Sequence, residues 1–83
     1  MNKSRSETLK AFGRLIRCRR LESGISQEEL GYRSSLDRTY VSGLERGVRN
    51  PSLTALVSLA HGFSISVSDL MECFEKEVEN ANQ

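Results

Sequence analysis

The stretch Ser26–Gly47, SQEELGYRSSLDRTYVSGLERG, reads as two short helices joined by a tight turn. Ser26 and Glu29 have the S-x-x-E spacing of a capping box, in which each side chain satisfies a backbone N–H of the other residue. Asp37 has the N-cap chemistry for the second helix, and Gly47 marks its end. This stretch therefore predicts two helices packed around a turn, and it decides the fold of the chain.

The second of these helices has a buried side and a polar side. At about 100° per residue, Val41 and Leu44 define the buried direction, and Glu45 lies close to its edge. The other residues form the polar side: Thr39, Gly43 and Arg46 point away from the core, Ser42 lies beside them, and Arg38 and Tyr40 flank them. Nothing inside so small a domain pairs with this surface, so it needs a partner.

Duplex DNA suits this polar side, because the major groove admits one helix and arginine can bind guanine O6 and N7 bidentately. We predict base contacts from Arg38, Thr39, Tyr40 and Ser42. Further grips on phosphates or edge bases are predicted from Gln27, Arg33, Arg46, Arg49 and Asn50, since helix N-termini and arginines bind anions. For any single arginine, a solvated position on the surface explains its presence about as well as a DNA contact does. The prediction therefore rests on the whole group of residues.

Gly43 and Glu45 need separate explanations. A mid-helix glycine costs about 1 kcal/mol relative to alanine. Close approach of the helix to a groove or to a neighbouring chain would rationalise Gly43, and neutral drift on a short helix explains it equally well. Glu45 near the core edge needs a cationic partner. We assign Arg20 to it, as a structural pair that locks the first helix to the third.

The rest of the chain predicts three more helices. Apolar residues at helical spacing run through about residues 7–23, 53–63 and 66–79. Gly24 ends the first of these, and Ser52 and Ser66 cap the other two. No β alternation competes. We therefore predict an all-α domain of five helices over residues 7–79, with a flexible basic arm at 1–6 and a frayed tail at 80–83.

Charge is distributed unevenly along the chain. The net charge is +1, but residues 1–50 carry +5 and residues 51–83 carry −4. A basic end attracts polyanions through counterion release, whereas chance asymmetry of a solvated surface is the plainer alternative. An acidic end points away from a polyanion or meets a protein.

A second copy of the chain is the protein partner that we predict. A domain of 83 residues is marginally stable on its own, and a symmetric dimer is the commonest remedy. The predicted dimer surface lies at the acidic end and includes Ile65, Val67, Met71, Phe74 and Val78. The inner residues of this stripe can instead complete the monomer core. We favour a division in which the inner residues belong to the core and Met71 or Phe74 lies at the dimer seam.

Other classes of protein fit the sequence less well. No apolar run approaches the ~18 residues of a membrane span and no secretory leader follows the basic start, so we expect a cytoplasmic protein. Cys18 and Cys73 lack CxxC or metal spacing and are expected to be packed or idle thiols. His61 is the sole histidine, with no local partner for catalysis. We expect no enzyme activity, metal, cofactor or small-molecule ligand.

The chain resembles the Cro/C1-type (Xre-like) helix-turn-helix family over about residues 9–71. The matching segments are Ile16-Arg17 and Arg20, GISQEEL at 24–30, LDRTYVSGLERG at 36–47, NPSL at 50–53, Leu59-Ala60 and SVSDL at 66–70. SQEEL followed by an ERG-type helix end and NPS is a specific combination, whereas any one piece would be weak. Among the subfamilies, the chain looks most like the controller proteins of restriction–modification systems.

This resemblance implies a lambda-repressor-like fold and a homodimer on a palindromic operator. It implies that the helix beginning near Arg38 enters the major groove, that Gln27 contacts a phosphate, and that Arg20 pairs with Glu45. Positions matching Arg38, Thr39, Tyr40 and Arg49 read or grip DNA in controller proteins. We therefore assign Arg49 to the bases, and Arg33, Arg46 and Asn50 to phosphates.

The chain departs from the family pattern at a few positions. Glycine usually stands where this chain has Ser35 and Ser64, and both serines would be strained in left-handed backbone. Alanine is usual at Gly31, and an apolar residue is frequent at Arg19. These departures affect fine geometry and leave the predicted fold unchanged.

The leading hypothesis is thus a homodimeric transcription regulator that binds double-stranded operator DNA. A phage-type repressor, or an antitoxin-like autoregulator whose main partner is another protein, is the alternative. The residues leave open the operator sequence, the sign of regulation and the choice between a controller protein and a phage-type repressor.

Overall fold

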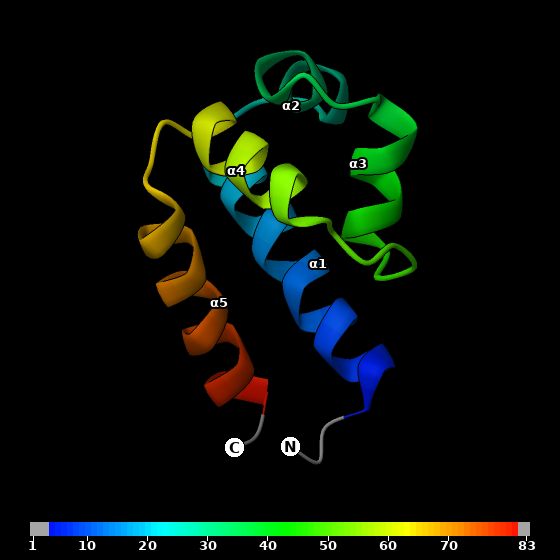
Figure 1. Cartoon of the computed structure of the whole chain (residues 1–83), viewed down its shortest axis with the longest axis vertical. Helices are drawn as coiled ribbons and strands as arrows, with labels where there is room; N and C mark the ends of the chain where they lie inside the picture. Colours follow the sequence, from blue (N-terminus) through cyan, green and yellow to red (C-terminus); the bar gives the residue numbers. More distant parts are fainter. Residues whose placement is uncertain (1–3, 82–83) are drawn as a thin grey trace.

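The computed structural model describes residues 4–81, which form five helices and no strand (Figure 1). The helices are α1 (Arg5–Glu22), α2 (Gln27–Ser34), α3 (Arg38–Glu45), α4 (Leu53–Gly62) and α5 (Val67–Ala81). The predicted all-α, five-helix fold is confirmed, with α2 and α3 as the helix pair around the turn.

The first helix begins two residues earlier than predicted. The Oγ atom of Ser4 accepts a hydrogen bond from the Glu7 N–H at 3.1 Å, and the Glu7 carboxylate accepts one from the Ser4 N–H at 3.4 Å. This is a complete capping box, so residues 5 and 6 are helical and do not belong to an arm. At the other end, α5 includes Asn80 and Ala81 and so extends beyond its predicted end at residue 79. Residues 1–3, 82 and 83 lie outside the described part of the chain.

The turn between α2 and α3 is built largely as predicted. The Ser26 hydroxyl caps α2 by accepting a hydrogen bond from the Glu29 N–H at 3.0 Å. The Glu29 carboxylate is engaged by Arg33 at 2.9 Å instead of completing the box. Ser35 follows α2 in the left-handed region, with φ 56°, which confirms the strain expected where the family usually has glycine.

Asp37 departs from its predicted role. It occupies the N-cap position of α3 with extended backbone, but its side chain makes no capping hydrogen bond. The first intrahelical hydrogen bond of α3 runs from the Val41 N–H to the Asp37 carbonyl at 3.0 Å, as at the start of any α-helix. The prediction of side-chain capping at this position is therefore wrong.

The core forms where α1 crosses the other helices. Its fully buried large side chains come from all five helices and are Ile16, Leu30, Val41, Leu44, Leu59 and Leu70. Helix α1 packs against α3 and α5, whereas α2 packs against α3 and α4 (Figure 1). A Cβ atom added to Gly13 of α1 would lie 2.6 Å from the carbonyl oxygens of Leu44 and Glu45. Only glycine allows this close contact between α1 and the end of α3.

Within residues 4–81, no single helix is both long and apolar enough to cross a membrane. The pair α4 and α5 passes that test by combined length and composition, but the two helices are bent by 100° at the break between them. Both helices contribute core residues to the domain, among them Leu59 and Leu70.

Candidate nucleic-acid interface

The end of α3 is anchored by a buried ion pair with α1. The Nε atom of Arg20 donates to Oε2 of Glu45 at 2.6 Å, and Nη2 donates to Oε1 at 3.1 Å. The third guanidinium nitrogen donates to the backbone carbonyl of Ile25 at 2.9 Å. Only 2% of the Glu45 side chain is exposed. The predicted structural pair is therefore present, and its hydrogen bonds raise the pKa of Arg20 above the usual value.

Gln27 joins this network from the start of α2. Its side-chain Nε2 donates to Oε1 of Glu45 at 3.0 Å. The carboxylate thus links residues of α1, α2 and α3 in one cluster of hydrogen bonds. This contact orients the Gln27 amide at the N-terminal end of α2, where its phosphate contact remains a prediction.

The rest of α3 presents the polar face that the sequence predicts, with one exception. Arg38, Thr39 and Arg46 are exposed, and Tyr40 and Ser42 are half-buried. The Nε atom of Arg46 lies 3.4 Å from the Ser42 hydroxyl, to which it donates a hydrogen bond. Val41 and Leu44 are buried on the opposite side. Arginine and hydroxyl groups therefore gather along the exposed side of an otherwise firmly packed helix.

The exception is Gly43, which points away from the core as predicted but is not exposed. Gly43 is buried, because the side chain of Arg49 folds back over it. The Arg49 guanidinium carbon lies 5.8 Å from the centre of the Tyr40 ring, within the range of a cation–π contact. The predicted orientation is thus correct, but Gly43 is not exposed, because the loop that follows α3 brings the Arg49 side chain over it.

The flanking polar residues occupy varied environments. Arg33 is half-exposed in an ion pair with Glu29 one turn earlier on α2. Arg49 and Asn50 are exposed in the loop after α3. Arg33 thus pairs within its own helix, whereas the Arg49 side chain lies against Gly43 of α3. Their phosphate and base contacts remain predictions.

A hollow beside α3 contains hydroxyl groups that the sequence reasoning missed. It has a volume of about 490 Å³ and is lined by Ser35, Leu36, Asp37, Tyr40, Ser52, Thr54, Ala55 and Ser58. The Ser52 N–H donates to the Tyr40 hydroxyl at 3.4 Å, which connects the start of α4 to α3. The NPS segment before α4 indicated a helix start, but only the fold shows that this start borders the polar face.

The chain has close relatives of known class. A helix-turn-helix family model matches residues 16–70. The control protein C.MunI of Mycoplasma sp is 40% identical over 67 residues, which cover 80% of this chain and 90% of that protein.

The chain belongs to this helix-turn-helix family.

Solved structures of restriction–modification controller proteins have the same fold as this helix-turn-helix protein. Wild-type C.Esp1396I matches with a TM-score of 0.80 and 38% identity, covering 88% of this chain and 95% of that one. The tetramer of C.Esp1396I in complex with its natural 35-base-pair operator matches with a TM-score of 0.79 and 39% identity, covering 86% and 93%. The resemblance to Cro/C1-type controller proteins is thus confirmed.

The predicted dimer residues of the helix-turn-helix protein lie at or near α5 and are all half-buried. Ile65, Val67 and Phe74 pack against the core, and the Phe74 ring meets Phe12 edge-on with centres 5.9 Å apart. Met71 is the member of the stripe that is not part of that packing. The role of these four residues in a dimer stays a prediction.

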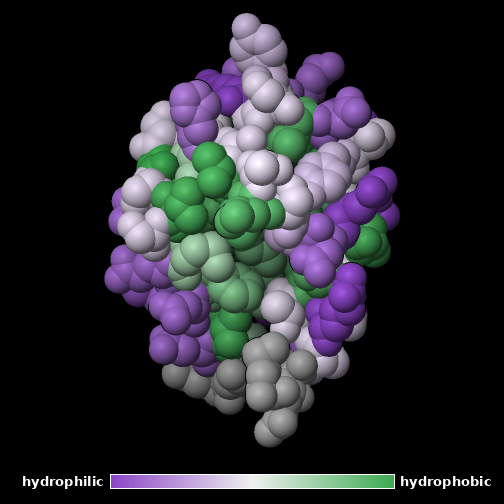
Figure 2. Space-filling model, in the orientation of Figure 1, coloured by the Kyte–Doolittle hydropathy of each residue, from purple (hydrophilic) through white to green (hydrophobic). Residues whose placement is uncertain are grey.

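Helix α4 adds apolar surface that the predicted dimer stripe did not include. Leu53 is 75% exposed and Val57 is 51% exposed. Apolar side chains gather on the face of the molecule where α4 and α5 lie (Figure 2). Apolar spacing predicts the helix α4, but it does not show which of its apolar residues stay exposed.

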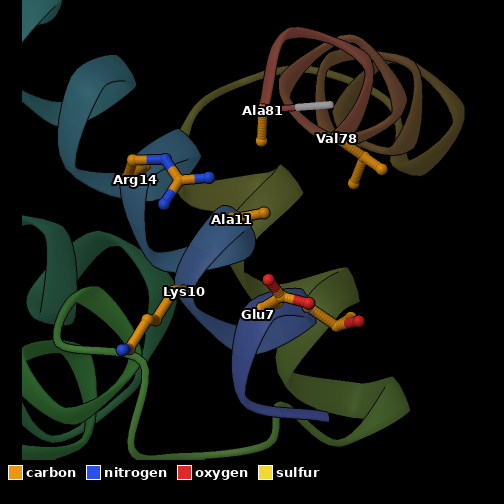
Figure 3. A pocket seen from close by; sticks show the side chains of 7 residues that line it. Glu7, Lys10, Ala11, Arg14, Val78 and Ala81 are labelled. Atoms are coloured by element: carbon orange, nitrogen blue, oxygen red, sulfur yellow. The ribbon is translucent and has the colours of Figure 1, made fainter. Parts of the chain in front are cut away.

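A second hollow lies between the start of α1 and the end of α5. It measures about 300 Å³ and is lined by Glu7, Thr8, Lys10, Ala11, Arg14, Val78 and Ala81 (Figure 3). Arg14 spans the two helices by donating to Glu77 at 2.9 Å. Among residues 4–81, no group of three or more His, Cys, Asp or Glu could hold a metal ion. Both cysteines are free thiols and His61 is exposed.

Proposed function

We propose that this protein is a sequence-specific DNA-binding transcription regulator, and that it serves as the controller protein of a restriction–modification system. The observation that carries the proposal is the exposed arginine and hydroxyl face of α3, on a helix anchored by the buried pair of Arg20 and Glu45. A helix fixed in this way can enter the major groove without rearranging the domain. The relative C.Esp1396I in complex with its operator supports the same assignment.

The proposed reading of bases rests on the chemistry of the α3 side chains. Arg38 begins the helix and is exposed, so its guanidinium can bind a guanine edge bidentately. Thr39 offers a methyl group to thymine, and Tyr40 and Ser42 offer hydroxyls. Arg49 reaches an edge base beside them. Gln27, Arg33, Arg46 and Asn50 are assigned to phosphates, which set the position of the helix without reading sequence.

We propose that two copies act together on a palindromic operator in the cytoplasm, as a binding protein without catalysis of its own. One α3 reads too few base pairs to be specific, and a twofold dimer would place two such helices about 34 Å apart. The seam assigned to Ile65, Val67, Met71 and Phe74 would extend to the exposed apolar residues of α4. In a sedimentation experiment, Met71→Lys should shift the dimer toward monomer while the helical circular-dichroism spectrum stays unchanged.

Footprinting on the DNA upstream of the protein's own gene tests the proposed function directly. We expect a protected palindrome, and we expect Arg38→Ala to lose about 1–3 kcal/mol of discrimination at one base position per half-site. Arg17→Ala is the matched control, because Arg17 is an exposed arginine of α1 and is assigned no DNA contact. It should leave the discrimination between sequences unchanged. Equal binding of the wild-type protein to random DNA would refute specific regulation.

The controller assignment has a separate test in the genome. An adjacent methyltransferase gene and endonuclease gene would support it. A neighbouring toxin gene, together with a small protein that co-purifies with the untagged chain, would support the antitoxin-like alternative instead.

A further inference from the structure

The chain reverses direction immediately after α3 and returns over Gly43. The Val48 N–H donates to the Gly43 carbonyl at 3.0 Å, and Gly47 has the left-handed φ of 76° that this reversal requires. Arg49 follows directly, so its side chain runs back along the exposed side of α3. The hydrocarbon stem of Arg49 lies over Gly43, and its guanidinium lies against the Tyr40 ring.

We propose that Gly43 is a positioning residue for Arg49 and, through Arg49, a determinant of base specificity. This inference rests on the proposed DNA-binding function of α3. Glycine is a poor helix former, and here the missing side chain creates the space that the arginine stem fills. Neither approach to a groove or a neighbouring chain nor neutral drift is then needed to explain Gly43, because a side chain of the same protein fills the space beside it.

The geometry shows what a larger residue would do. A Cβ atom at position 43 would lie 2.6 Å from Cγ of Arg49, 3.5 Å from Nε and 3.6 Å from Cδ. These atoms belong to a flexible side chain, so the backbone can stay in place and the arginine must leave. The guanidinium would then lose its place 5.8 Å from the Tyr40 ring centre.

A guanidinium held in one orientation favours recognition of a particular base over general attraction to the phosphates. Arginine loses many rotamers when it binds, and a side chain already held in one orientation loses fewer on contact with DNA. Bidentate recognition of guanine also requires the guanidinium plane to be oriented. Tyr40 is itself tied to the start of α4 by its hydrogen bond from the Ser52 N–H. An arginine released from Gly43 keeps its charge and its attraction to phosphates but loses this orientation.

The test compares the wild type with Gly43→Ala, Arg49→Ala and the double variant, on the operator and on operators changed at each base pair. We expect Gly43→Ala to lose about tenfold in discrimination at the same base pairs that Arg49→Ala affects, with non-specific affinity retained. In the Arg49→Ala background, Gly43→Ala should have no further effect on discrimination. Unchanged discrimination in Gly43→Ala, or losses that add fully in the double variant, would overturn the inference.

Two controls separate positioning from folding. Val48→Ala trims an exposed neighbour that is assigned no DNA contact, and it should leave discrimination unchanged. The thermal unfolding midpoint of Gly43→Ala should not fall, because alanine is the better helix former. A large fall together with lost helicity would attribute the effect to damage of α3 and would overturn the inference.

A measurement without DNA tests the geometry itself. In nuclear magnetic resonance spectra of the free protein, the Hα atoms of Gly43 should show a nuclear Overhauser contact with the Hγ atoms of Arg49. Absence of that contact would overturn the inference whatever the protein binds. If the wild-type protein fails to prefer any operator, the proposed function fails. If it prefers one and Gly43→Ala behaves identically, only the role of Gly43 fails.

Discussion

Replacing Arg20 with methionine is the sharpest test of how α3 is held. Met fills a similar volume but removes the charge and all three nitrogen donors. Glu45 would then keep a carboxylate whose side chain is only 2% exposed, while the Gln27 amide still donates a hydrogen bond to it. The Ile25 carbonyl would lose the hydrogen bond that it accepts from the Arg20 guanidinium at 2.9 Å. The change therefore leaves a buried charge without its compensating cation.

The expected loss is large relative to the stability of the whole domain. Breaking a buried pair from one side costs about 3–5 kcal/mol. A chain of 83 residues has a total stability of about 4–12 kcal/mol at typical values per residue. Arg20→Met should therefore bring the domain close to the unfolded state at room temperature. The double variant Arg20→Met with Glu45→Leu removes both charges and should lie much closer to the wild type.

Urea denaturation followed by circular dichroism measures these free energies of unfolding. Arg14→Met is the matched control, because Arg14 pairs with Glu77 while about half of the Arg14 side chain is exposed (49%), and it should cost less than about 1 kcal/mol. A loss below about 1 kcal/mol in Arg20→Met, or a double variant no more stable than the single, would refute the reasoning.

The pKa of Arg20 also fixes how this stabilisation depends on pH. Its folded-state pKa is raised by the hydrogen bonds to Glu45, so protonated Arg20 contributes fully below the usual guanidinium pKa. That contribution is lost only as pH rises through the higher folded value. Titration of Arg20 should thus leave the free energy of unfolding unchanged between about pH 5 and pH 9.

The remaining predictions concern single positions of the scaffold. Gly13→Ala should cost about 1–3 kcal/mol, because the added Cβ would lie 2.6 Å from the Leu44 carbonyl oxygen; an unchanged unfolding midpoint would contradict this close packing. Ser35→Gly and Ser64→Gly should each raise stability by up to about 1 kcal/mol, because their φ angles are 56° and 59°; a loss in both would show that the serine hydroxyls matter more than the strain. Ser52→Ala removes the cap of α4 and should cost about 0.5–2 kcal/mol, with Ser52→Asp as the variant that restores stability.

Local sequence patterns, namely apolar spacing and capping residues, were sufficient to predict most of the fold. The spacing of Val41 and Leu44 identified the buried side of α3 correctly, because a helix of regular pitch repeats its faces. Serine caps marked the starts of α2, α4 and α5. The start of α1 was misplaced although Ser4 and Glu7 have the same S-x-x-E spacing. The residues contained that information, and the basic composition of the first positions outweighed it in the prediction.

The errors at Asp37 and Gly43 have a different origin. Both positions depend on contacts that no local rule describes. Asp37 has the residue type, the position and the extended backbone of an N-cap, yet its side chain makes no capping hydrogen bond. The environment of Gly43 depends on a residue beyond the end of the helix, brought back by a left-handed turn at Gly47. A helical projection treats each helix as isolated, so it cannot predict which side chains the following loop supplies.

Helix α1 connects the two functional ends of the proposed regulator. On one side it meets α3, through the close contact at Gly13 and the pair of Arg20 with Glu45. On the other side it meets α5, through Arg14 with Glu77 and through the ring contact of Phe12 with Phe74. The reading helix and the proposed dimer seam are thus fixed to one rigid element. In a dimer, the spacing between the two α3 helices would follow from the geometry of α1, so substitutions at Gly13 should change the tolerated spacing of half-sites as well as stability.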